Sequence, residues 1–81
     1  MALKILYFAG LREAIGCSGE SFDLPSGVAT VGALREVLGK VRPELLAAKN
    51  LRAAVNQKMV GHEAPVADGD EVAFFPPVTG G

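Results

Sequence analysis

The chain has 81 residues, a net charge of −1 at neutral pH, 49% hydrophobic residues and 21% charged residues. This length provides one small domain, and a weakly acidic chain lacks the basic surface that nucleic-acid binding requires. A single cysteine, Cys17, and a single histidine, His62, exclude an internal disulfide, a four-cysteine zinc site and a cysteine-ligated iron–sulfur cluster.

The first part of the chain predicts two paired strands. Residues 3–9 are of types that suit a strand, and the N-terminus enters this pattern without the layout of a signal peptide. Residues 10–16 are bracketed by glycines and predict a turn or one helical turn. Residues 20–24 alternate polar and apolar and predict a second strand, which Pro25-Ser26-Gly27 ends.

No apolar run in the sequence approaches the length of a membrane span, so we expect a cytoplasmic protein without membrane contact.

The middle of the chain predicts one main helix. Thr30 is a suitable N-cap for a helix that runs to about Val41. Pro43 stops this helix and opens a short second one over residues 44–48. The spacing predicts one apolar face made of Val31, Leu34, Leu38 and Val41, with Val37 beside it.

Three short strands are predicted in the last part. Residues 51–56 alternate, and Asn56-Gln57 suits a hairpin turn into residues 58–60 because Asn tolerates positive φ. Residues 67–70 form a strong turn, and residues 71–75 are the last strand. The order predicts an α+β fold of the β-grasp (ubiquitin-like) type, a mixed sheet with one main helix packed across one face.

Apolar residues on both faces of two strands indicate a docking surface. A single helix covers one side of the sheet, so the four residues on the other side are expected to form an exposed apolar patch. These residues are Leu6, Phe8, Ala73 and Phe75. The alternative is that loops cover them, or that they are buried on both faces of a central strand.

The final segment predicts an extended arm, residues 76–81, on a domain of residues 1–75. Pro76-Pro77 cannot extend the sheet and favours a semi-rigid polyproline-like chain. Gly80-Gly81 carries no Cβ atoms and can pass a narrow channel. The one reactive group is the α-carboxylate of Gly81, which ATP must convert to an acyl-adenylate before a nucleophile can displace AMP. The chain has no phosphate-binding glycine motif, so a second protein must supply this activation.

The sequence resembles the MoaD family of ubiquitin-like sulfur carriers, the small subunits of molybdopterin synthase. The closest stretch is residues 68–81, Asp-Gly-Asp-Glu-Val-Ala-Phe-Phe-Pro-Pro-Val-Thr-Gly-Gly. Residues 6–13, Leu-Tyr-Phe-Ala-Gly-Leu-Arg-Glu, and residues 53–57, Ala-Ala-Val-Asn-Gln, support it. Together with the order of elements, the resemblance spans essentially the whole chain.

This resemblance implies a function. An activating enzyme of the ubiquitin-E1 type adenylates Gly81, and a persulfide-based donor converts it to a thiocarboxylate. The tail enters the active site of the large molybdopterin synthase subunit, in a heterotetramer, and sulfur passes to cyclic pyranopterin monophosphate. The chain is then a carrier without catalysis or bound cofactor of its own. The resemblance gives Gly80 the role of flexible neighbour, places Phe75 to Thr79 (with Pro76, Pro77 and Val78) along the path into the partner, and adds Phe8 to the docking patch.

Two other functions use the same terminus: sulfur delivery for thiamine biosynthesis, and attachment to lysines as a ubiquitin-like modifier. The remaining polar candidates favour structural roles. Cys17 has no adjacent basic residue to lower its pKa, and His62 lies in a predicted loop. The acidic cluster of Asp68, Asp70 and Glu71 is explained by the preference of Asp and Gly for turns, and it offers too few ligands for calcium. The charged side chains of Arg52 and Lys58 are expected to be solvated.

Overall fold

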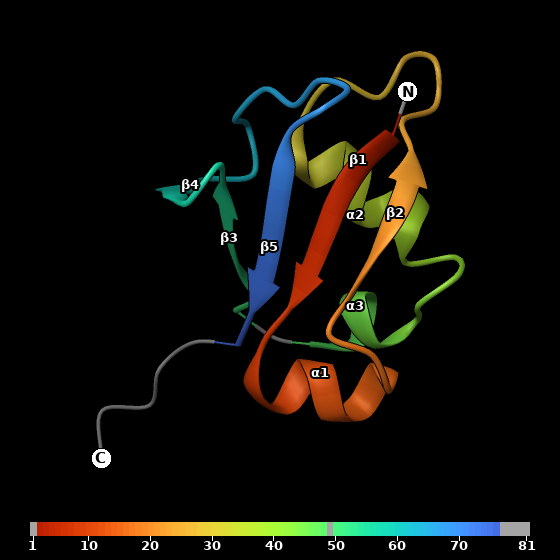
Figure 1. Ribbon diagram of the computed structural model, residues 1–81, viewed down its shortest axis with the longest axis vertical. Coiled ribbons are helices and arrows are strands. Elements are labelled where there is room, and N and C mark those ends of the chain that lie inside the picture. The colour runs from red at the N-terminus through yellow and green to blue at the C-terminus, as the bar shows by residue number, and fades with distance from the viewer. Residues whose placement is uncertain (1, 49, 77–81) are drawn as a thin grey trace.

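The structure is a computed structural model that describes residues 2–48 and 50–76 (Figure 1). Its elements are β1 (Ala2–Tyr7), α1 (Ala9–Ile15), β2 (Gly19–Asp23), α2 (Val31–Leu38), α3 (Glu44–Ala47), β3 (Arg52–Val55), β4 (Lys58–Val60) and β5 (Glu71–Phe75). The strands form one mixed sheet in the order β2-β1-β5-β3-β4. The predicted α+β fold is therefore confirmed.

The first and last strands lie side by side and run parallel. Ile5 of β1 faces Val72 of β5, and β2 and β3 flank this pair in antiparallel fashion. Parallel neighbours finish at the same end of a sheet. Phe8, just after β1, donates its N–H to the carbonyl of Phe74 over 3.2 Å. The segment that follows β5 therefore begins beside the end of β1.

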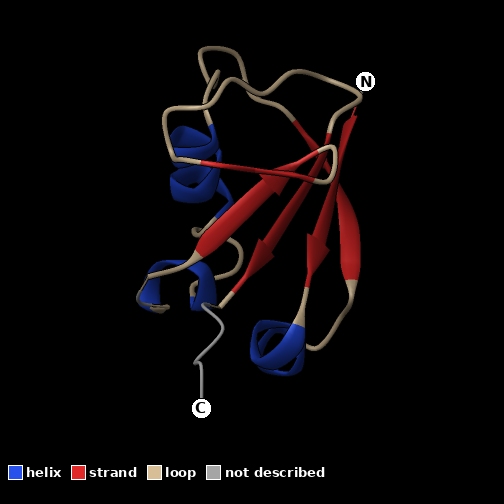
Figure 2. Ribbon diagram, turned by 90° about the vertical axis from the view of Figure 1, so that its left-hand side faces the viewer, coloured by secondary structure: helices blue, strands red, loops and turns tan. Residues whose placement is uncertain are grey.

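The helices are distributed unevenly around the sheet. Figure 2 shows α2 and α3 on one face, while α1 lies at the end where β1 and β5 finish. Alternate strand residues point toward the helices and form the core. Its fully buried members include Leu3, Ile5, Tyr7, Val31, Leu34, Leu38, Leu45, Val72 and Phe74. No helix of residues 2–48 and 50–76 combines the length and apolar character needed to cross a bilayer.

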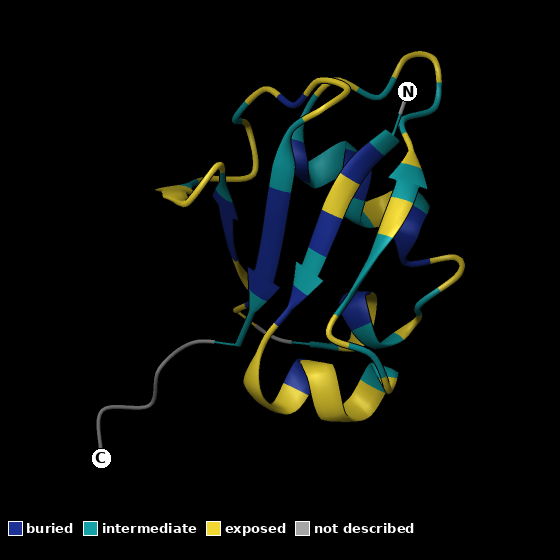
Figure 3. Ribbon diagram, in the orientation of Figure 1, coloured by how far each residue is buried: buried dark blue, intermediate teal, exposed yellow. Residues whose placement is uncertain are grey.

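The segment between β1 and β2 is more helical than predicted. α1 is a seven-residue helix, where the sequence predicts a turn or one helical turn, and β1 ends at Tyr7 rather than at Ala9. Leu11 is buried and anchors α1 at the end of the sheet where β1 and β5 finish. Most of the other residues of α1 are exposed (Figure 3). Gly16 ends the helix in the left-handed conformation, φ 94°, which favours glycine.

The main helix starts where predicted and ends earlier. Thr30 is its N-cap, since the side-chain oxygen accepts a hydrogen bond from the N–H of Ala33 over 3.2 Å. The helix stops at Leu38, so the prediction that it runs to about Val41, with Val41 on its apolar face, is wrong: Val41 lies beyond the helix and is 61% exposed. Leu46 packs onto Gly39, where an added Cβ would lie 2.4 Å from the Leu46 Cγ. The chain therefore turns after Leu38, and α3 follows close by.

The predicted hairpin is confirmed. Asn56 and Gln57 connect β3 to β4 with φ values of 52° and 71°. Positive φ at both central residues is the geometry of a two-residue turn whose twist matches that of the strands. β5 covers Glu71–Phe75, the range that the sequence predicts.

Candidate functional site

A row of mostly small side chains crosses the uncovered face of the sheet. Neighbouring strands place Leu6 beside Ala73, Ala73 beside Ala54, and Ala54 beside Met59. At the other edge Leu6 faces Gly19 of β2. The row has alanines at its centre, Ala73 on β5 and Ala54 on β3, and larger side chains on either side, Leu6 and Met59. The small alanine side chains leave a depression in the middle of this face.

The result is a shallow apolar depression of about 710 Å³, which we call the trough. Its lining residues are Leu6, Phe8, Ala9, Ala54, Gln57, Glu71, Ala73, Phe75 and Pro76. Phe8 is 47% exposed, so about half of its surface remains open to solvent. A large aromatic residue left half in water beside further apolar side chains is typical of a surface that binds a partner.

The four residues that the sequence predicts for the patch all line the trough. Phe8 is exposed and Leu6 and Phe75 are partly buried, but Ala73 is only 8% exposed, so the prediction of an exposed patch is wrong for Ala73, which a central strand buries. Leu6, Phe8, Ala73 and Phe75 come from β1, from the residue after it, and from β5. The parallel pairing of these strands brings the four together. Their role in binding a partner stays a prediction.

The trough includes residues that the sequence analysis does not propose, among them Ala54 in its floor and Gln57, which lines it together with Glu71. Met59, 60% exposed, lies outside the lining and continues the row of side chains on β4. The alternation within residues 51–56 could have predicted that Ala54 lies on the uncovered face of the sheet. The sequence could not have placed Met59 beside Ala54, because this neighbour depends on the pairing of β4 with β3.

The chain leaves the trough at Pro76. This residue also lines a second, smaller groove of about 350 Å³ between α1 and α3, which includes Leu11, Ala14 and Leu51. Apolar surface therefore flanks the start of the predicted arm on two sides. Pro77, Val78, Thr79, Gly80 and Gly81 lie outside the described residues, so the extended arm and the role of Gly81 stay predictions.

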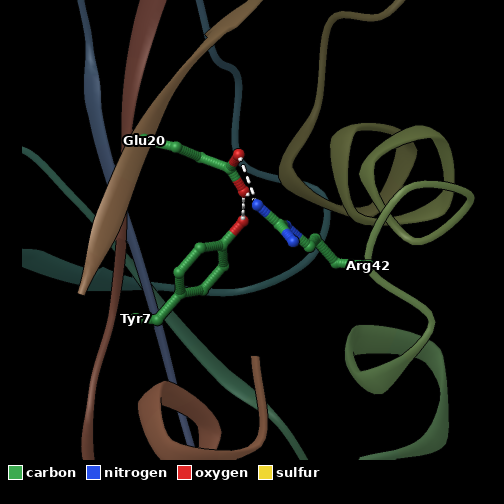
Figure 4. Close-up of polar contacts among 3 residues, drawn as sticks. All are labelled: Tyr7, Glu20 and Arg42. Atoms are coloured by element: carbon green, nitrogen blue, oxygen red, sulfur yellow. Dashed lines mark hydrogen bonds and ion pairs between the residues drawn. The ribbon is translucent and has the colours of Figure 1, made fainter. Parts of the chain in front are cut away.

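A polar network lies on the opposite, helix-covered face. The Tyr7 hydroxyl donates to Glu20 Oε2 over 2.6 Å, and Arg42 donates to both carboxylate oxygens of Glu20, over 2.9 and 3.0 Å (Figure 4). The network joins β1, β2 and the segment between α2 and α3. It points away from the trough, so we assign it a structural role.

Each member of this network has a shifted pKa. The hydrogen bonds from Arg42 hold the pKa of the Glu20 carboxyl below its usual value, against the opposing effect of burial. Burial, followed by the hydrogen bond to Glu20, raises the pKa of the Tyr7 hydroxyl. The hydrogen bond to Glu20 raises the pKa of the Arg42 guanidinium. All three groups are held in their ordinary ionisation states at neutral pH.

The other polar candidates have separate places in the fold. Cys17 is half-buried against the core, and His62 is exposed in a loop, where its carbonyl accepts the N–H of Gly32 over 2.8 Å. Asp70 accepts the N–H of Ala67 over 2.9 Å, which is the predicted turn chemistry. Among residues 2–48 and 50–76, no three His, Cys, Asp or Glu side chains are grouped closely enough to hold a metal ion.

Comparisons with known proteins agree over nearly the full length. Residues 5–81 match the ThiS family. The molybdopterin synthase sulfur carrier subunit of Escherichia coli is 43% identical, over 98% of this chain and 99% of that protein.

Two solved structures share the fold. A putative molybdopterin converting factor subunit 1 from Pyrococcus furiosus has a TM-score of 0.81 and 31% identity, over 96% of this chain and 99% of that one. The small archaeal modifier protein 1 of Haloferax volcanii has a TM-score of 0.80 and 28% identity, over 95% and 98%.

Proposed function

The chain belongs to the ThiS family, and we propose that it is the sulfur carrier subunit of a molybdopterin synthase. The observation that carries the proposal is the 43% identity, over almost the whole of both chains, to the Escherichia coli protein of that name. The apolar trough that ends at Pro76 supports it, because a carrier must bind the proteins that load and unload its terminus.

The reactive group is the carboxylate of Gly81. A partner enzyme of the E1 type joins it to the AMP part of ATP and releases pyrophosphate. A persulfide sulfur then attacks the acyl carbon and displaces AMP, and a thiol reduces the remaining sulfur–sulfur bond, leaving a thiocarboxylate on Gly81. The sulfur passes to cyclic pyranopterin monophosphate, and water returns the terminus to a carboxylate. The chemistry is performed by the partners, and this chain carries the sulfur without a bound cofactor.

The trough is the surface for the large subunit of the synthase. The large subunit packs against four residues of the trough, Leu6, Phe8, Ala73 and Phe75. Pro76 and Pro77 direct Val78 and Thr79 into the active site of the large subunit. Gly80 has no side chain to obstruct the approach of Gly81 to the reacting sulfur acceptor. Two carriers and two large subunits form the assembly. Because the charging step consumes ATP, we place the protein in the cytoplasm.

Mass spectrometry of the protein isolated from its own cell tests the proposal. We expect Gly81 to be the last residue, with one terminal oxygen replaced by sulfur in a fraction of the molecules. Incubation of this form with the large subunit and cyclic pyranopterin monophosphate is expected to yield molybdopterin. A sulfurated carrier that gives no molybdopterin in this reaction but supports thiamine synthesis would contradict the assignment.

A second candidate function is attachment to other proteins. The observation that favours it is the close fold match to an archaeal modifier protein. Digestion of the proteins of the same cell, followed by mass spectrometry, separates the two: a modifier is found joined through the Gly81 carboxyl to lysine side chains of other proteins, and tryptic digestion leaves residues 59–81 on those lysines because Lys58 is the last basic residue.

A further inference from the structure

The Ala-Ala-Val-Asn-Gln segment, residues 53–57, contains one polar side chain that the function proposed above does not use. Asn56 sits in the β3–β4 turn, and its amide reaches across to the start of β5. The amide Oδ1 accepts the N–H of Glu71 over 3.0 Å, and Nδ2 donates to Asp70 Oδ1 over 3.1 Å. The Asn56 N–H donates to the carbonyl of Glu71 over 2.7 Å.

Asp70 connects this contact to the rest of the fold. Its second carboxylate oxygen accepts the N–H of Ala67 over 2.9 Å, and its carbonyl accepts the N–H of Lys4 in β1 over 3.0 Å. The Asn56 side chain therefore ties the hairpin turn to a point that is fixed on both β1 and the turn before β5. We call the pair of side chains Asn56 and Asp70 the latch.

The latch lies next to the trough. Gln57, the next residue, and Glu71, which bonds to Asn56, both line it. β4 has three residues and pairs with β3 alone among the described strands, so the angle of the hairpin decides where Met59 stands. An edge strand this short has few other contacts to hold it.

From this geometry we propose that Asn56 is a positioning residue for partner docking: through Asp70 it sets the hairpin so that Gln57 lines the trough and Met59 extends the docking surface beside it. This inference rests on the proposed function, because the docked partner is the large subunit named there. In this proposal Asn56 has no part in the chemistry and acts through the shape of the surface alone.

The variant Asn56→Gly tests the proposal, since glycine accepts the positive φ of this position and only the amide is lost. We expect calorimetric titration with the large subunit to show binding weakened about tenfold, or about 1.4 kcal/mol. We also expect the Met59 amide signal of the free protein to shift in NMR spectra, while the fold is retained.

A side-chain exchange provides the rescue. In the double variant Asn56→Asp, Asp70→Asn, the carboxylate accepts the Glu71 N–H, and the new amide donates to the carboxylate and accepts the Ala67 N–H. All three side-chain hydrogen bonds and the net charge are kept. We expect this variant to recover wild-type affinity and the wild-type Met59 signal.

Thr30→Ala is the matched control, because it also removes one side-chain hydrogen bond to the backbone but on the helix side of the sheet. Its affinity should equal that of the wild type. Three results would overturn the inference: tight binding by Asn56→Gly, no recovery in the exchange variant, or an equal loss in Thr30→Ala. Failure of the wild type itself to bind would instead contradict the proposed function, and the inference with it.

Discussion

Phe8 offers the sharpest test of the trough as a docking surface. Its side chain is 47% exposed, so it contributes moderately to folding and leaves about half of its surface for a partner. An aromatic side chain buries about 150–250 Å² when covered, so docking would remove about 100 Å² of Phe8 from water. At about 25 cal/mol per Å², this contact is worth about 2.5 kcal/mol. The substitution Phe8→Ala should therefore weaken binding to the large subunit by about 60-fold.

Leu46 provides the matched control for this experiment. It is also a large apolar residue with 47% exposure, but it lies on α3, on the other side of the sheet. Each truncation to alanine should lower the free energy of unfolding by about 1–2 kcal/mol, because about half of each side chain is packed against the protein and that packing is lost. Titration calorimetry at a temperature where both variants are folded should show a loss of affinity for Phe8→Ala alone. Equal affinities of the two variants would refute the assignment of the trough.

Three further predictions concern the tail, the trough and the polar network. Deleting Gly81, or adding one residue after it, should abolish sulfur transfer while circular dichroism shows an unchanged fold; transfer at the wild-type rate by either variant would contradict the mechanism. Phe75→Asp places a charge in the trough beside the start of the arm and should weaken binding to the large subunit at least about tenfold by surface plasmon resonance, and unchanged affinity would remove Phe75 from the docking surface. Because Arg42 holds the folded-state pKa of Glu20 below its unfolded value of about 4.3, the stability from this pair is present above that pH and is lost as the pH falls through the folded-state value. Glu20→Gln should therefore melt about 4–8 °C lower than the wild type at pH 7, with a smaller difference at pH 3; a difference that does not change with pH would show that the ion pair does not stabilise the fold.

Local patterns in the sequence predict the strands and the turns because their causes are local. The Asn56-Gln57 turn needs residues that tolerate positive φ, and the alternation in residues 71–75 fixes which side chains of β5 share a face. Thr30 caps α2 through an oxygen three residues from its donor. Contacts between residues no more than a few positions apart depend on the local sequence, so they can be predicted without a tertiary structure.

The end of α2 could not be derived in this way. The helical spacing continues to Val41, yet the helix stops at Leu38. Gly39 is the C-cap, Leu46 of α3 packs onto it, and the turn that follows carries Arg42 to Glu20 on β2, a contact between residues far apart in the sequence. Periodicity records which residues are apolar and contains no information on where the next helix must pack.

The sequence by itself predicts the chemistry of this protein: a catalytically sparse domain with Gly80-Gly81 as the expected reactive element, and four apolar residues for one face of the sheet. The tertiary structure decided how those residues become a surface. The parallel pairing of β1 and β5 brings Leu6, Phe8 and Phe75 to the place where Pro76 leaves the sheet, and the pairing of β3 with β5 adds Ala54. Register between strands depends on contacts far apart along the chain, and this is the physical reason that only the folded structure places these side chains in one trough.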